Sequence, residues 1–112
     1  MNTSFAFIDF SNNPQTYINS GILKVEVIGK ICILTFTDII VRNNPTNNTA
    51  IISSPLIPTS KYEVSTLLVA AALNGAQKVH ILGNTNVINN YWTTDSHRGS
   101  GYFLGQLVYI IV

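Results

Sequence analysis

The segment from Tyr91 to Tyr102 holds the densest mixture of chemically active side chains in this sequence. It reads YWTTDSHRGSGY and brings together aromatic rings, a carboxylate, an imidazole and a guanidinium group. This mixture suits a saccharide, because an aromatic ring covers the apolar face of a pyranose while polar side chains hydrogen-bond its hydroxyls. The candidate binding residues of the segment are Tyr91, Trp92, Asp95, His97 and Arg98.

A structural loop explains the same residues without any ligand. In that interpretation Trp92 fills one end of a core and Asp95 pairs with Arg98 at the surface. In the binding interpretation, Arg98 is also suited to a phosphate or carboxylate carried by a glycan. The segment alone does not decide between the two interpretations.

Catalysis and metal binding find less support than saccharide binding. The residue types of a catalytic triad are present at Asp95, Ser96, His97 and Ser100, but a triad is defined by geometry and no G-x-S-x-G motif occurs. Glycosidases need two facing carboxylates, and the chain has five acidic residues in all. A metal site would require the fold to bring His80 and His97 to Asp95. We therefore predict a protein that is not an enzyme and has no metal or cofactor, and a small hydrolase is the least favoured alternative.

The composition predicts a single β-rich domain. The chain has 112 residues, of which 46% are hydrophobic and only 10% charged, against about 25% charged residues in an average soluble domain. These values exclude a disordered chain. Six basic residues spread along a chain of net charge +1 do not form the basic patch of a nucleic-acid binder. The apolar residues include many Ile and Val, which favour strands, and the frequent Asn residues favour turns.

Cysteine content and hydropathy predict whether the protein has disulfides, inserts into a membrane or is exported. The single cysteine, Cys32, excludes an internal disulfide, and its place in an apolar run predicts a buried hydrophobic residue. No apolar run reaches the ~20 residues of a membrane-spanning helix, so we expect no membrane insertion. The N-terminus lacks the basic start and apolar core of a signal peptide, which predicts synthesis in the cytoplasm. Met1 is either native or an added start.

Alternating hydrophobicity predicts a series of short antiparallel strands. Residues 22–28 and 31–37 flank a Gly29-Lys30 turn and form a predicted hairpin. Residues 62–73 and 77–83 flank an Asn-Gly turn and predict a second hairpin, with a short helix over 62–73 as the alternative. Further strands are expected at 87–92 and 101–112, and a long loop at 43–49. This pattern predicts an all-β antiparallel sandwich or jelly roll over residues 21–112, preceded by an N-terminal arm or lead-in strand over 1–20.

The last predicted strand is apolar on both of its faces. One face carries Tyr102, Leu104, Val108, Ile110 and Val112, and the other carries Phe103, Leu107, Tyr109 and Ile111. A small sandwich has one interior, so the second face needs a cover from outside it. We expect a subunit interface to provide this cover. The alternative is that loops or the N-terminal arm of the same chain, with Phe5, Phe7, Ile8 and Phe10, cover the face.

The order of these elements resembles a known family. The runs are GKICILTFTD, SSPLIPTSKY, an Asn-Gly turn, KVHILGNTNV, an aromatic YW pair and SHRGSGYFLGQLVYI. This layout is similar to the C-terminal head domains of receptor-binding tail proteins from phages of Gram-positive bacteria, such as lower baseplate proteins of lactococcal siphophages. The resemblance covers about residues 20–112, by pattern more than by identity, and includes an Arg-Gly-x-Gly-x-Tyr-like run at Arg98–Tyr102.

The resemblance implies a function and a site. It implies a β-sandwich head that forms a homotrimer at the phage tail tip, within the virion, and binds host cell-wall polysaccharide without catalysis. It adds His80 to the saccharide-binding candidates and supports Trp92, Asp95, His97 and Arg98. The alternative is a purely structural baseplate or fibre domain that binds other phage tail proteins. Family members carry an N-terminal stem, for which this chain has no room, so the chain is either an excised head or a small relative.

Overall fold

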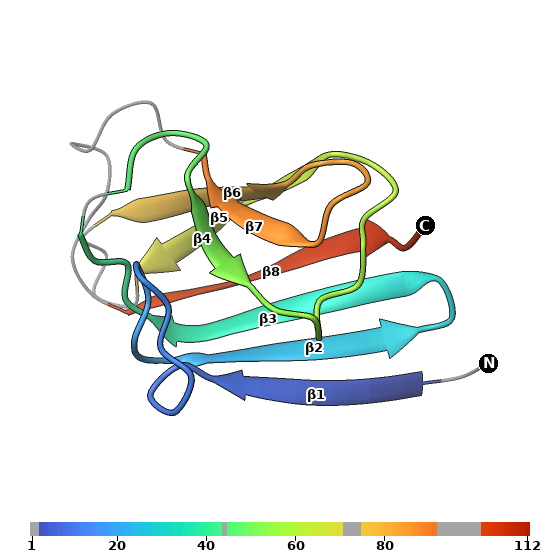
Figure 1. The fold of residues 1–112 in the computed structure, drawn as a ribbon, viewed down its shortest axis with the longest axis horizontal. Helices are drawn as coiled ribbons and strands as arrows, with labels where there is room; N and C mark the ends of the chain where they lie inside the picture. Colours follow the sequence, from blue (N-terminus) through green and yellow to red (C-terminus); the bar gives the residue numbers. More distant parts are fainter. Residues whose placement is uncertain (1–2, 44, 71–74, 92–101) are drawn as a thin grey trace.

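The protein is an all-β domain of antiparallel strands, as its sequence predicts. A computed structural model describes residues 3–43, 45–70, 75–91 and 102–112. Their strands run in the order β1-β2-β3-β8-β5-β6-β7-β4 across the sheet (Figure 1). The strands are β1 (Thr3–Asp9), β2 (Ile22–Ile28), β3 (Ile31–Ile39), β4 (Ala50–Ser53), β5 (Val64–Ala70), β6 (Ala76–Ile81), β7 (Val87–Asn90) and β8 (Phe103–Ile110).

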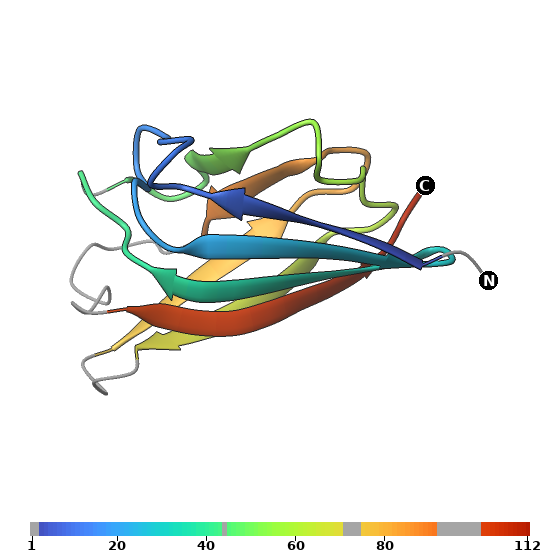
Figure 2. The same cartoon turned by 90° about the horizontal axis from the view of Figure 1, so that it is seen from below.

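The strands form one curled sheet. Hydrogen bonding joins all the described strands without a break, so a sandwich of two separate sheets is not confirmed. The curl brings β4 over the side of the sheet where β1 lies (Figure 2). The side chain of Gln15 links these two edges: its amide donates to the Ser53 carbonyl at 3.2 Å and accepts from the Ser53 N–H at 3.2 Å. None of the described segments forms a helix that would reach across a lipid bilayer.

Both expected hairpins are present. β2 pairs with β3 around Gly29, whose φ of 60° suits the tight turn, and β5 pairs with β6. The helix alternative is wrong over Val64–Ala70, because Leu68 and Ala70 are buried while their neighbours on the strand are exposed. That alternation with a period of two is the pattern of a strand with one core-facing side. The Asn74 part of the predicted turn lies outside the described residues.

Residues before β2 belong to the same sheet and the same core. Thr3–Asp9 pairs along its full length with β2, so an antiparallel lead-in strand occupies the start of the chain. Phe10 and Ile18 follow this strand and are completely buried. The N-terminal residues therefore add both a sheet edge and core volume.

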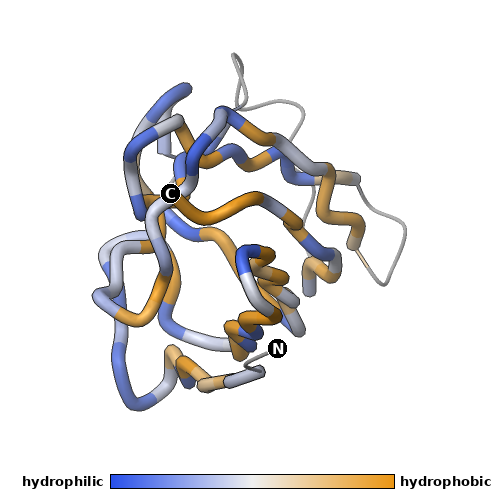
Figure 3. Tube along the Cα trace, turned by 90° about the vertical axis from the view of Figure 1, so that its right-hand side faces the viewer, coloured by the Kyte–Doolittle hydropathy of each residue, from blue (hydrophilic) through white to orange (hydrophobic). Residues whose placement is uncertain are grey.

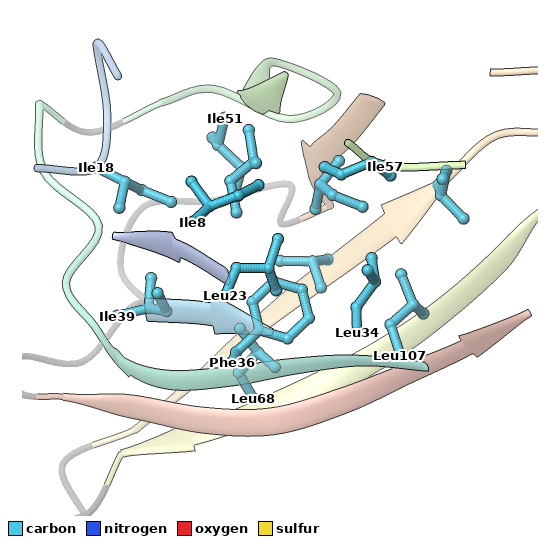
Figure 4. Close-up of a cluster of buried hydrophobic side chains, with 14 of the residues drawn as sticks. Ile8, Ile18, Leu23, Leu34, Phe36, Ile39, Ile51, Ile57, Leu68 and Leu107 are labelled. Carbon is cyan, nitrogen blue, oxygen red and sulfur yellow. The ribbon is translucent and has the colours of Figure 1, made fainter. Parts of the chain in front are cut away.

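The concave side of the curl holds the hydrophobic core. Buried side chains from every strand pack together there, as Figure 4 shows for ten labelled residues. Alternating hydrophobic and polar residues are visible as orange and blue stretches along the strands (Figure 3). Cys32 is one of the buried residues and has a free thiol, which confirms its predicted role as a small hydrophobic side chain.

β8 has the two-faced pattern that its sequence predicts. Phe103, Leu107 and Tyr109 are at most 3% exposed, whereas Val108 and Ile110 are 49% and 47% exposed. The alternative in which the N-terminal arm covers the second face is wrong. The arm is an edge strand of the same sheet, three positions away from β8, and its own Phe5 and Phe7 are exposed on that face.

Among the described residues, asparagines lie in turns and loops, with two exceptions. Asn43, Asn48 and Asn84 adopt positive φ angles of 63–64°, a conformation that Asn tolerates better than most residues. Asn89 and Asn90 instead lie inside β7 and are buried. At Asn90, side-chain hydrogen bonds to Gln77, Pro45 and Thr46 override the preference of Asn for turns.

Candidate functional site

Two of the six predicted saccharide-binding residues lie in the described part of the chain. His80 is on β6 and Tyr91 directly follows β7. The other four, Trp92, Asp95, His97 and Arg98, lie outside the described residues, as does the suggested Asp95–Arg98 ion pair.

His80 points away from the core although it is buried. Its neighbours on β6, Val79 and Ile81, face the core, so the alternation of the strand places His80 on the opposite, convex face. The side chain is nevertheless only 3% exposed. Neither ring nitrogen has a hydrogen-bond partner among the described residues. A buried imidazole with unsatisfied nitrogens is unusual, since buried polar atoms are normally paired.

Tyr91 covers the imidazole. The two rings stack with centroids 4.1 Å apart and planes 18° apart. Tyr91 is held in place by its backbone N–H, which donates to the Lys78 carbonyl at 3.0 Å. The ammonium of Lys78 lies 4.8 Å from the centroid of the tyrosine ring, a cation–π distance. The tyrosine ring thus contacts both an imidazole and a cation.

Glu63 completes the cluster from the residues that precede β5. Its Oε2 lies 3.4 Å from Nδ1 of His80, close enough for an ion pair when the imidazole is protonated. The carboxylate side chain is 55% exposed, so it keeps hydrogen-bonding capacity toward solvent or a ligand. We call Glu63, Lys78, His80 and Tyr91 the His80 cluster.

A buried polar pair fixes the strand that carries Tyr91. Gln77 and Asn90 are fully buried and hydrogen-bond each other through their side-chain amides. Asn90 also donates to the carbonyls of Pro45 at 3.0 Å and Thr46 at 2.9 Å. Because Asn90 immediately precedes Tyr91, these bonds set the direction in which the chain leaves β7.

The chemistry of the His80 cluster fits recognition of a polar ligand. It offers a carboxylate as acceptor and an ammonium as donor next to an aromatic ring, whereas both nitrogens of the imidazole are buried. Among the described residues, no three His, Cys, Asp or Glu side chains gather in a way that would hold a metal ion. The structure thus brings His80 and Tyr91, two of the six predicted residues, into direct contact.

Sequence reasoning missed Glu63 and Lys78. Lys78 could have been predicted, because the spacing Lys78-Val79-His80 places the two polar residues on one face of a strand. Glu63 was not, because its approach to His80 depends on the pairing of β5 with β6, in which Ser65 lies opposite His80. Register is set by the turn, and a shift of one residue would separate the two side chains.

Comparison of the chain with protein-family models, with curated proteins and with solved structures found no match.

Proposed function

We propose that this chain is a saccharide-binding domain without catalytic activity, of the kind found as the head of phage tail receptor-binding proteins, and that it acts as a homotrimer. In this proposal it is part of the virion at the tail tip and binds host cell-wall polysaccharide. The observation that carries the binding part is the His80 cluster. It joins an aromatic ring to a carboxylate, an imidazole and a cation beside the segment whose composition suits a sugar.

The convex face of the sheet supports the oligomeric part. Register places exposed apolar side chains from five neighbouring strands on this one face. They are Phe5, Phe7, Ile22, Ile31, Leu67, Val69, Val108 and Ile110, each 41–64% exposed. Together they present on the order of 700 Å² of apolar surface, close to the ~800 Å² that one partner contributes to a standard interface. Lys24 and Glu26 of β2 interrupt this face between the side chains of β1 and those of β3. Exposed apolar surface of this size still marks an interaction site.

Trimerisation would also strengthen weak sugar binding. Leu67 of the convex face pairs across strands with Lys78, so the apolar surface adjoins the His80 cluster. Copies that associate through this face would present their binding clusters together. Linked sites of this kind raise avidity by ~10²–10⁴ without any new contact.

Binding to purified host cell-wall polysaccharide and to a glycan array tests the proposal. We expect Tyr91→Ala and Glu63→Gln to weaken binding at least tenfold while thermal unfolding stays cooperative. Tyr62→Ala is the matched control, because Tyr62, like Tyr91, lies beside a lysine, with Lys61 Nζ 5.7 Å from its ring centroid, but is remote in sequence from His80. Equal binding by all three variants and the wild type would place the site elsewhere.

A purely structural domain that binds other phage tail proteins is the second candidate. The same exposed convex face favours it, because another tail protein would cover these side chains as well as a second copy does. An oligomer that binds no glycan and no cell-wall polysaccharide would favour this candidate over the first.

A further inference from the structure

A pocket lies at the end of the sheet where β1 and β3 finish and β8 begins. It has a volume of about 280 Å³ and is separate from the His80 cluster on β6. Its lining includes two carboxylates, three hydroxyl groups and an aromatic ring, from Asp9, Asp38, Ser11, Ser20, Thr37 and Tyr102. The sequence gives no sign of this gathering, since Asp9 and Asp38 are 29 positions apart and Tyr102 is far from both.

Three unusual backbone features shape the end of the sheet at which the pocket lies. The register between β3 and β8 shifts between Phe36 and Ile39, which places Asp38 in a β-bulge. Asp38 has a φ of 55° within that bulge. Gly21 approaches so closely that a Cβ atom there would lie 2.4 Å from the Asp38 carbonyl oxygen. Bulges re-aim side chains and recur next to functional sites.

The polar groups of the pocket have unused hydrogen-bonding capacity. The Ser20 hydroxyl oxygen is buried and has no hydrogen-bond partner within the described residues. The Asp38 side chain is exposed, and none of the hydrogen bonds or ion pairs found among those residues uses its carboxylate. Asp9 accepts from the Ser11 N–H at 3.0 Å and the Asn12 amide at 3.3 Å, which orients its carboxylate and leaves further lone pairs free.

The apolar part of the pocket comes from Tyr102 and Ile22. Tyr102 is 53% exposed, so its ring is open to a ligand, whereas Ile22 also belongs to the convex face that we propose other copies cover. A ring-shaped ligand with one apolar face and several hydroxyls would contact the tyrosine ring on one side and the carboxylates on the other. The volume is slightly below the ~300–1,000 Å³ of sites for drug-sized ligands, which suits a ligand of about one sugar ring.

We propose that this pocket, formed by Asp9, Ser20, Asp38 and Tyr102, is a second binding site for a neutral pyranose. The class of ligand rests on the proposed saccharide-binding function, whereas the location does not. Carboxylates accept hydrogen bonds from sugar hydroxyls, and among the described residues no cationic side chain lines the pocket, so the two carboxylates disfavour a phosphorylated or otherwise anionic sugar. A calcium ion is disfavoured, because among the described residues no third acidic side chain joins Asp9 and Asp38.

Nuclear magnetic resonance of the ¹⁵N-labelled chain tests the proposal. The probes are the methyl glycosides of glucose, galactose and N-acetylglucosamine, with glucose 6-phosphate and calcium chloride titrated separately. We expect at least one methyl glycoside to shift the backbone amides of Ser11, Gly21 and Asp38, and glucose 6-phosphate to bind at least tenfold more weakly than methyl glucoside. Asp38→Asn is the main variant, because Asn tolerates the positive φ and the fold is retained.

The variants separate this site from the His80 cluster. Asp38→Asn and Tyr102→Ala should each weaken the response at Gly21 at least tenfold, and Tyr62→Ala should leave it unchanged. Shifts confined to Lys78 and Tyr91 would overturn the second site and leave the proposed function standing. Shifts at Gly21 without any at Tyr91 would support the second site and count against the His80 cluster. A response to calcium alone, or to none of the probes, would also overturn the proposal.

Discussion

Replacing Asn90 by alanine removes the side chain that joins β7 to the loop at residues 45–49. The amide of Asn90 donates two hydrogen bonds to backbone carbonyls, at 2.9 and 3.0 Å, and accepts one from Gln77. The residue is fully buried, so water does not replace these partners without a rearrangement. Each hydrogen bond is worth about 1 kcal/mol net, and the groups left unpaired add to the cost. We therefore expect a loss of about 3 kcal/mol in the free energy of unfolding.

Urea unfolding followed by circular dichroism measures this loss. In thermal unfolding, a loss of this size lowers the Tm by about 10–15 °C for a domain of this length. The slope of the free energy of unfolding against urea concentration (the m-value) should be unchanged, because the surface exposed on unfolding is the same. Asn86→Ala is the matched control, since Asn86 donates a single long bond of 3.4 Å to the Ser54 carbonyl. We expect that variant to lose less than about 0.5 kcal/mol.

A double-mutant cycle with Gln77→Ala isolates the pair of side chains. Gln77 bonds Asn90 directly, so the two single losses should overlap by about 1 kcal/mol in the double variant. Equal free energies of unfolding for Asn90→Ala and Asn86→Ala would contradict this expectation. Simple additivity of the losses caused by Gln77→Ala and Asn90→Ala would contradict it as well.

Four further outcomes follow from single contacts. Gly21→Ala should lose about 2–4 kcal/mol in urea unfolding, because its Cβ would lie 2.4 Å from a β3 carbonyl oxygen at a φ of 91°. Burial raises the pKa of the Cys32 thiol, so the thiol should react with a thiol reagent at pH 8 only after denaturation. Rapid reaction in the native protein would contradict the burial of Cys32. Tyr109→Phe should cost about 1–2 kcal/mol, since it removes a 2.6 Å hydrogen bond to the Pro58 carbonyl. Val108→Lys should keep the fold, since Val108 is 49% exposed, but shift the protein toward monomer in size-exclusion chromatography.

Local features of the fold were predictable from the sequence. The alternation of Lys24 and Glu26 with apolar neighbours predicts which face of β2 is buried, and the structure confirms it for Leu23 and Val25. The Gly29 turn and the two faces of β8 were equally readable. In each case a short stretch of chain contains both the pattern and its explanation.

Features that join distant segments were not predictable. The pairing of β3 with β8 brings together residues more than 60 positions apart, and their hydrophobic patterns fit several other partners equally well. The burial of Asn90 depends on carbonyls 44 and 45 positions away. The approach of Glu63 to His80, and the gathering of Asp9 and Asp38 in one pocket, depend on register and on a bulge in β3.

We propose that other copies of this chain cover the convex face of the sheet, where Val108 and Ile110 are about half exposed. Sedimentation equilibrium of the intact protein at tens of micromolar measures this association. We expect a mass three times that of the 12.3 kDa chain, and a lower mass for Val108→Lys. A soluble species of 12.3 kDa across the whole concentration range would contradict it.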